Sequence, residues 1–171
     1  HCMKDIFISH SWCKDGLKRN NHTRCKKLAD KLIKNGYTVW FDSYDLFGNI
    51  DATIMEGINN AKVVLVCLTK KYCDKINNCV SNQVTNDNCY KEWNYSIFKN
   101  KIIIPVLMEP CMIDIFLTQE GVIQMHLNSM MFINFSKNLV SDFKLLCKNM
   151  TKHKVISNIV KKTINDTIKD M

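Results

Sequence analysis

Two acidic residues, Asp42 and Glu92, occupy positions from which a carboxylate could act in catalysis or bind a ribose. Asp42 ends an apolar segment that predicts a strand, and Glu92 lies near the start of a predicted helix. In a parallel sheet both would lie at the edge where ligands bind. An acid in a first helical turn is also favoured by the helix dipole, so position alone leaves a structural and a catalytic role for Glu92 open.

Three polar residues, Ser9, His10 and Ser11, follow a short apolar segment that predicts the first strand. A serine beside a histidine suggests a nucleophile and its base. However, neighbouring residues in a strand point to opposite faces, which disfavours a direct Ser9–His10 pair. We interpret this segment as a loop that lines a ligand site.

The nine cysteines are odd in number, and Cys67 and Cys147 lie within apolar runs, which favours free thiols in a reducing, cytoplasmic compartment. Cys73, Cys79 and Cys89 could bind zinc, but their spacing matches no paired C-x-x-C pattern. We therefore expect no metal site.

Several classes of protein are disfavoured by missing motifs. The chain has five glycines and contains neither a G-x-G-x-x-G nor a P-loop pattern, and no G-x-S-x-G elbow. Its net charge of +8 is concentrated in residues 137–171, which favours a solvated helical surface; the alternative is contact with an acidic partner, lipid or nucleic acid. No nucleic-acid-binding motif accompanies the charge, so we expect no nucleic-acid partner.

The longest apolar runs, Val63–Leu68 and Ile102–Met108, are too short to span a bilayer, and no leader-like segment opens the chain. We therefore expect a segment that is neither secreted nor membrane-spanning.

The elements that must position these residues alternate between strand and helix, which predicts a parallel sheet with helices on both faces. The expected strands are Asp5–Ser11, Tyr37–Asp42, Lys62–Thr69, Lys101–Met108 and Met131–Phe135. The expected helices are Thr23–Asn35, Thr53–Ala61, Cys89–Asn100, Lys137–Met150 and Val155–Ile168. Residues 70–88 and 109–129 are expected to be irregular. In the fourth helix, Val140, Phe143, Cys147 and Met150 are expected to point inward.

Six segments in order resemble the signature of a TIR (Toll/interleukin-1 receptor) domain: DIFISHSW, GYTVWFD, DLFGNID, INNAKVVLVCLTKKY, NCYKEW and IIIPVLM. The resemblance covers residues 4–150 and implies a flavodoxin-like α/β domain of three layers, with a five-stranded parallel sheet flanked by helices. Residues 151–171 lie outside it, and we expect a C-terminal helical extension that caps the domain, frays or forms an assembly contact.

The segment Asn88, Cys89 and Glu92 (N-C-x-x-E) resembles that of TIR domains that cleave NAD⁺, which implies that NAD⁺ is a substrate rather than a cofactor. The N-C-x-x-E segment then makes Glu92 the catalytic residue, next to the nicotinamide ribose. Several of these enzymes carry a tryptophan four residues before the glutamate, where this chain has Asn88. The substrate-binding residues that the resemblance implies are Ser9, His10, Ser11, Trp12, Asp42, Leu46 and Asn88.

A self-association loop is also implied by the resemblance. In the family this loop mediates contacts between TIR domains and gates the cleft. Its residues here are Asp45, Leu46, Phe47, Gly48 and Asn49. Two functions remain open: an NAD⁺ glycohydrolase or cyclase activated by self-association in immune or cell-death signalling, and a non-catalytic adaptor that only binds other TIR domains.

Overall fold

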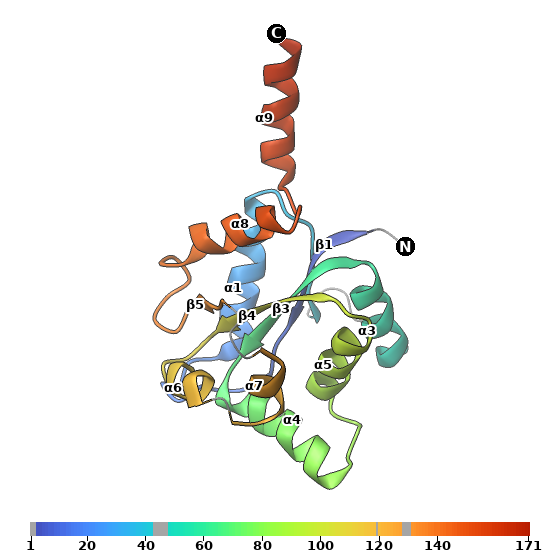
Figure 1. The fold of residues 1–171 in the computed structure, drawn as a ribbon, viewed down its shortest axis with the longest axis vertical. Helices are drawn as coiled ribbons and strands as arrows, with labels where there is room; N and C mark the ends of the chain where they lie inside the picture. Colours follow the sequence, from blue (N-terminus) through green and yellow to red (C-terminus); the bar gives the residue numbers. More distant parts are fainter. Residues whose placement is uncertain (1–2, 43–47, 119, 128–130) are drawn as a thin grey trace.

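A five-stranded, all-parallel sheet lies at the centre of the molecule, in the order β2-β1-β3-β4-β5 (Figure 1). The computed structural model describes residues 3–42, 48–118, 120–127 and 131–171. The strands are β1 (Lys4–Ser9), β2 (Val39–Trp40), β3 (Ala61–Leu68), β4 (Ile102–Leu107) and β5 (Ile133–Asn134). All five lie within the predicted segments or one residue beyond them, and the flavodoxin-like α/β fold is confirmed.

Alternating strand residues supply a separate core on each face of the sheet. Ile6 and Ile8 pack on the face covered by α1 (Asn21–Lys34) and α8 (Phe143–Lys152). Phe7 packs on the opposite face. The helices there are α3 (Ile50–Asn59), α4 (Lys70–Asn82), α5 (Asn88–Phe98), α6 (Cys111–Thr118) and α7 (Val122–Leu127). Because each buried Leu, Ile, Val or Phe side chain stabilises the fold by about 1.5–3 kcal/mol, the strand residues fix both helical layers.

The strand order reverses at β1, because the chain passes from β1 to β2 on one side and then to β3 on the other. The connections after β1 and β3 therefore leave the sheet in opposite directions and open a crevice between them. Crevices at such switch points, beyond the carboxyl ends of the strands, are the usual ligand sites of this architecture.

The expectation that residues 70–88 are irregular is wrong, because α4 occupies most of this segment. The Thr69 side chain caps the helix by accepting a hydrogen bond from the Tyr72 amide. Tyr72, Ile76 and Cys79 recur at helical spacing and are buried. Their burial outweighs the polar residues between them, which had suggested a loop.

The segment 109–129 was also expected to be irregular, yet α6 and α7 form within it. Met112, Ile123 and Leu127 are buried against the second face of the sheet. Both helices are short, so their stability comes from this packing rather than from helix propensity.

The helix expected from Lys137 begins instead at Phe143, as α8. The Asn138 side chain accepts hydrogen bonds from the amides of Val140 and Ser141, and this turn replaces the first helical turns. Val140 is consequently 69% exposed and does not point inward, whereas Phe143 and Met150 are buried as expected.

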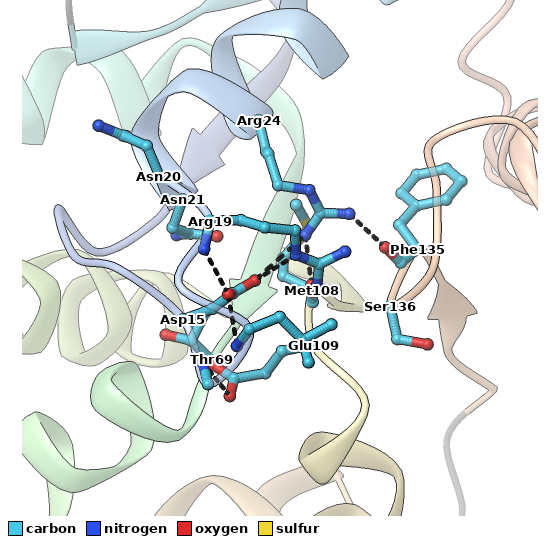
Figure 2. A network of polar contacts seen from close by, with 12 residues as sticks. Asp15, Arg19, Asn20, Asn21, Arg24, Thr69, Met108, Glu109, Phe135 and Ser136 are labelled. Atoms are coloured by element: carbon cyan, nitrogen blue, oxygen red, sulfur yellow. Dashed lines mark hydrogen bonds and ion pairs between the residues drawn. The ribbon is translucent and has the colours of Figure 1, made fainter.

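A network of polar contacts fixes the loop between β1 and α1 (residues 10–20) against the ends of β4 and β5 (Figure 2). The Asp15 carboxylate accepts hydrogen bonds from the Leu17 and Arg19 amides and from Arg19 Nε. Arg24 donates to the carbonyls of Met108 and Phe135. These contacts therefore hold the loop on the side of Asp15 and Arg19, away from the point where it leaves β1.

The last helix, α9 (Asn158–Lys169), projects from the domain and carries the C-terminus at its tip (Figure 1). None of its residues is buried, so it does not cap the core; a role in assembly stays a prediction. Val155, just before it, is buried in the first core. Within the described ranges, no helix combines the length and apolar character needed to cross a membrane.

Candidate active site

A cavity of about 400 Å³ opens beyond the carboxyl ends of β1 and β2. Elements far apart in the sequence form its walls, because the switch point brings their ends together. Its lining residues are His10, Trp12, Asp42, Ile54, Lys75, Asn86, Asp87, Asn88, Cys89 and Glu92. Its place at the switch point and the buried Glu92 on its wall make it the candidate site for chemistry.

Glu92 is positioned by α5, but not in the way that the sequence suggested. The helix begins at Asn88, and Asp87 caps it by accepting a hydrogen bond from the Tyr90 amide. Glu92 therefore lies in the second turn, and the first turn contains no acidic residue. Stabilisation by the helix dipole fades beyond the first turn, so it does not explain this buried glutamate.

The Glu92 carboxylate is buried beside a hydroxyl pair. The Ser9 hydroxyl donates a hydrogen bond of 2.5 Å to Glu92 Oε2, and the same hydroxyl lies 2.7 Å from the Tyr72 hydroxyl. Burial raises the pKa of Glu92 to about 8; Asp42 and Asp87 also raise it, whereas the Ser9 hydrogen bond lowers it. Within the described part of the chain Glu92 forms no ion pair, so its charge is controlled by these neighbours.

A cluster of aromatic and polar side chains forms the opposite wall. His10 Nε2 lies 2.7 Å from His22 Nδ1, and the Trp12 indole stacks on the His22 ring with centroids 3.3 Å apart. Trp12 Nε1 donates to Asp42 Oδ2 at 2.7 Å. Burial, together with the neighbouring His22, lowers the pKa of His10 to about 3, so His10 is neutral at physiological pH.

Of the predicted substrate-binding residues, His10, Trp12, Asp42 and Asn88 line the cavity together with Glu92. Ser9 reaches it through its bond to Glu92. The cavity lining does not include Ser11, whose hydroxyl lies 3.0 Å from that of Thr69. Ser9 and His10 do point to different partners, so the structure agrees with the inference that they form no direct nucleophile–base pair.

The predicted self-association loop is described only in part. Gly48 has a φ of 69°, and the Asn49 side chain caps α3 by accepting a hydrogen bond from the Ala52 amide. Asp45, Leu46 and Phe47 lie outside the described residues.

Sequence reasoning missed several residues of the site, among them His22, Lys75 and Asp87. Asp87 could have been found, because an Asp directly before a helix is a common N-cap. Lys75, which lies 3.6 Å from Asp87, was hidden by the assignment of its segment as a loop. His22 gave no local signal, since it meets His10 and Asp42 only through the tertiary fold.

A larger groove of about 510 Å³ lies between α3 and α5. Its walls are mostly apolar, and its carboxylate, Asp51, is paired with Lys91 at 2.7 Å. The smaller cavity is lined by Glu92 and His10, whose pKa values burial shifts strongly. Because such perturbed groups cluster at functional sites, the smaller cavity remains the candidate for catalysis.

Comparison with known proteins places this geometry in a family. The family model described as "TIR domain" matches residues 6–147. Among solved structures, the TIR domain of the Toll-related receptor TRR-2 from Hydra magnipapillata aligns with a TM-score of 0.57 and 20% identity, covering 87% of this chain and 99% of that one. The TIR domains of the activated Roq1 resistosome, which directly recognises the pathogen effector XopQ, align with a TM-score of 0.44 and 21% identity, covering 98% of each chain.

The search of curated proteins found no significant match. The receptor structure supports the fold, and the family model covers most of the chain. The chain therefore belongs to the TIR-domain family.

Proposed function

We propose that this TIR domain cleaves the N-glycosidic bond of NAD⁺, with Glu92 as the catalytic residue. The observation that carries the proposal is a buried carboxyl group with a raised pKa, on the wall of a polar cavity at the sheet's switch point. Burying a carboxyl group lowers the stability of the fold. Residues that destabilise a fold without a structural benefit are concentrated at functional sites.

The chemistry needs one ionised carboxylate. As the bond between the ribose carbon and the nicotinamide nitrogen breaks, its electron pair leaves with nicotinamide, which becomes neutral. The ribose ring then carries positive charge, which a nearby carboxylate stabilises. Water adds to that carbon and releases a proton to give ADP-ribose; attack by an internal nucleophile would give a cyclic product. Ser9, which donates to Glu92, orients the carboxylate and favours its charged form.

Two cavity residues supply complementary binding chemistry. Trp12 is 61% exposed and presents an indole beside the cavity, so it could stack on a base in place of the tryptophan that several TIR NADases carry where this chain has Asn88. Lys75, which also lines the cavity, carries an ammonium group that would supply a counter-charge for a pyrophosphate.

The decisive experiment is NAD⁺ consumption by the purified chain at high concentration or under crowding, with nicotinamide measured as product. We expect Glu92→Gln to lower the rate by at least about 100-fold, because a neutral amide cannot stabilise the cation. Glu120→Gln, an exposed glutamate outside the cavity, is the matched control and should keep full activity. Wild-type protein that leaves NAD⁺ intact over hours, even when associated, would refute the proposal.

The second candidate is an adaptor that binds other TIR domains without catalysis. It is supported by the apolar groove between α3 and α5, where Phe98 is 79% exposed and Met55 is 47% exposed. Exposed apolar patches of this kind mark protein-binding surfaces. Both candidates involve homotypic association, and the Glu92→Gln experiment separates them.

A cytoplasmic location also stays a proposal. The eight described cysteines, Cys13, Cys25, Cys67, Cys73, Cys79, Cys89, Cys111 and Cys147, all carry free thiols. Free thiols favour a reducing compartment.

A further inference from the structure

Three ligand-type atoms meet beside the cavity, which His10 and Asp42 help to line. His10 Nε2, His22 Nδ1 and Asp42 Oδ1 all lie within 4.8 Å of one another. The two nitrogens are 2.7 Å apart, and the carboxylate oxygen is 3.7 Å from the first and 3.8 Å from the second. The sequence had directed attention to Cys73, Cys79 and Cys89 instead, and these three do not form such a group among the described residues.

We propose that His10, His22 and Asp42 form a binding site for a divalent transition-metal ion of the zinc class. The point equidistant from the three atoms lies about 2.0 Å from each, which is the usual zinc–nitrogen and zinc–oxygen distance. Two imidazoles and one carboxylate suit such ions, whereas magnesium and calcium prefer an all-oxygen shell.

The ligands come from three elements that only the fold brings together. His10 follows β1, His22 lies in the first turn of α1, and Asp42 follows β2. Aromatic rings restrain both imidazoles: Phe41 stacks on His10 with centroids 4.7 Å apart, and Trp12 stacks on His22. Rings held in this way need little reorganisation to bind an ion.

The carboxylate is oriented as well. Trp12 Nε1 donates to Asp42 Oδ2, and the other oxygen, Oδ1, faces the two imidazoles. Hydrogen bonds of this type to a ligating carboxylate are typical supports of metal sites. His10, Trp12 and Asp42 also line the cavity, so a fourth ligand could approach from that side.

In the ion-free protein the two imidazole nitrogens share a hydrogen bond, and an ion would replace it. The rings must then separate and turn slightly, because ligand nitrogens around zinc lie about 3.3 Å apart when each is about 2.0 Å from a tetrahedral ion. This site goes beyond the proposed NAD⁺ cleavage and does not depend on it.

The test is titration of the purified full chain with Zn²⁺ by calorimetry and with Co²⁺ by visible absorption, in the absence of NAD⁺. We expect one ion per chain and cobalt d–d bands without the intense sulfur-to-cobalt charge-transfer band that a cysteine site gives. His22→Gln should weaken binding at least about tenfold. His153→Gln, at the C-cap of α8 and outside the cavity lining, is the matched control and should bind like the wild type.

Asp42→Asn is the second variant, and it should also weaken binding of the ion. If neither variant folds, the cobalt spectrum of the wild type decides whether the ligands are imidazole and carboxylate groups or thiolates. Three outcomes would overturn the site: no ion bound at millimolar concentration, a thiolate charge-transfer band, or affinity unchanged in the folded His22→Gln protein. Because NAD⁺ is absent from this experiment, its failure leaves the proposed catalytic function untouched.

Discussion

At the scale of single residues, the central feature is a carboxylate whose protonation is set by burial. The pKa of Glu92, raised to about 8, makes its charged form a minority at neutral pH. A carboxylate that must stabilise a cation has to be ionised, so the pH dependence of activity tests its role directly.

We expect the rate of NAD⁺ cleavage to rise with pH and level off above about pH 8. The Ser9 hydrogen bond lowers the pKa of Glu92, so Ser9→Ala should move the midpoint to higher pH and reduce the rate most strongly at neutral pH. Steady-state rates between pH 6 and 10 provide the measurement, with the exposed Ser81→Ala as control. An unshifted profile in Ser9→Ala would show that this contact does not act on the titrating group.

Glu92 should also make the wild-type fold less stable as pH rises. A carboxyl whose folded pKa is raised binds its proton more tightly in the folded state, so the free energy of unfolding falls between the ordinary pKa of 4.5 and about 8. Glu92→Gln removes this loss. We expect Glu92→Gln and the wild type to have similar melting temperatures at pH 4. At pH 9 the variant should melt several degrees higher than the wild type, because each kcal/mol of stability shifts the melting temperature by roughly 2–4 °C. A difference that stays constant with pH would contradict the buried charge.

At the scale of elements, the site depends on loops that are fixed from outside it. The loop after β1 carries His10 and Trp12 at one end and Asp15 at the other, where the network of Figure 2 attaches it to β4 and β5. Stability and site geometry are therefore linked through one loop.

Asp15→Asn should destabilise the fold by about 2–3 kcal/mol, since it leaves the partly buried Arg19 without its counter-charge. The melting temperature should fall by roughly 5–10 °C at neutral pH. Although burial raises the pKa of Asp15, the hydrogen bonds from Arg19 and Leu17 lower it overall, so this stabilisation is lost as pH falls. The difference in melting temperature between Asp15→Asn and the wild type should therefore become smaller at acidic pH.

Asp30→Asn is the matched control, because Asp30 forms an exposed pair with Lys26 on the surface of α1. Exposed pairs contribute about 0–1 kcal/mol, so thermal unfolding should change little. Equal effects of the two substitutions would show that the network adds nothing beyond surface charge.

At the scale of the whole molecule, the proposed activity depends on association between copies. Gly48 belongs to the predicted self-association loop and has a φ of 69°, a conformation that costs other residues about 1–2 kcal/mol. Among the described residues, no neighbouring atom lies within 4 Å of the position of its missing Cβ. Gly48→Ala should therefore disturb the loop's conformation without a clash in the described part of the fold.

We expect the activity per molecule of Gly48→Ala to fall at low protein concentration and to recover at high concentration or under crowding. The activity of Glu92→Gln should recover under neither condition, because this variant lacks the catalytic carboxylate, whereas its association with other copies is intact. The measurement is specific activity as a function of protein concentration, with association followed by light scattering. A Gly48→Ala deficit that is independent of concentration would argue against a role in association.

The sequence by itself determined the fold class and most of the candidate site. The strand segments are apolar, and alternate residues of each strand face the cores on opposite sides of the sheet, which specifies a parallel sheet. The carboxyl ends of parallel strands lie along one edge of that sheet. His10, Trp12, Asp42 and Glu92 therefore converge on the cavity as expected. The sequence did not reveal α4, because its few buried residues are separated by polar ones.

The tertiary structure decided what these residues can do. The raised pKa of Glu92 arises from burial among side chains of β1, α4 and α5, and no local pattern encodes a sum over distant elements. His22 likewise meets His10 and Asp42 only in the folded chain, because the three residues come from separate elements. Two residues predicted to line the cavity thereby become part of a candidate metal site. Local periodicity determines which face a residue occupies, and long-range packing determines its neighbours and hence its chemistry.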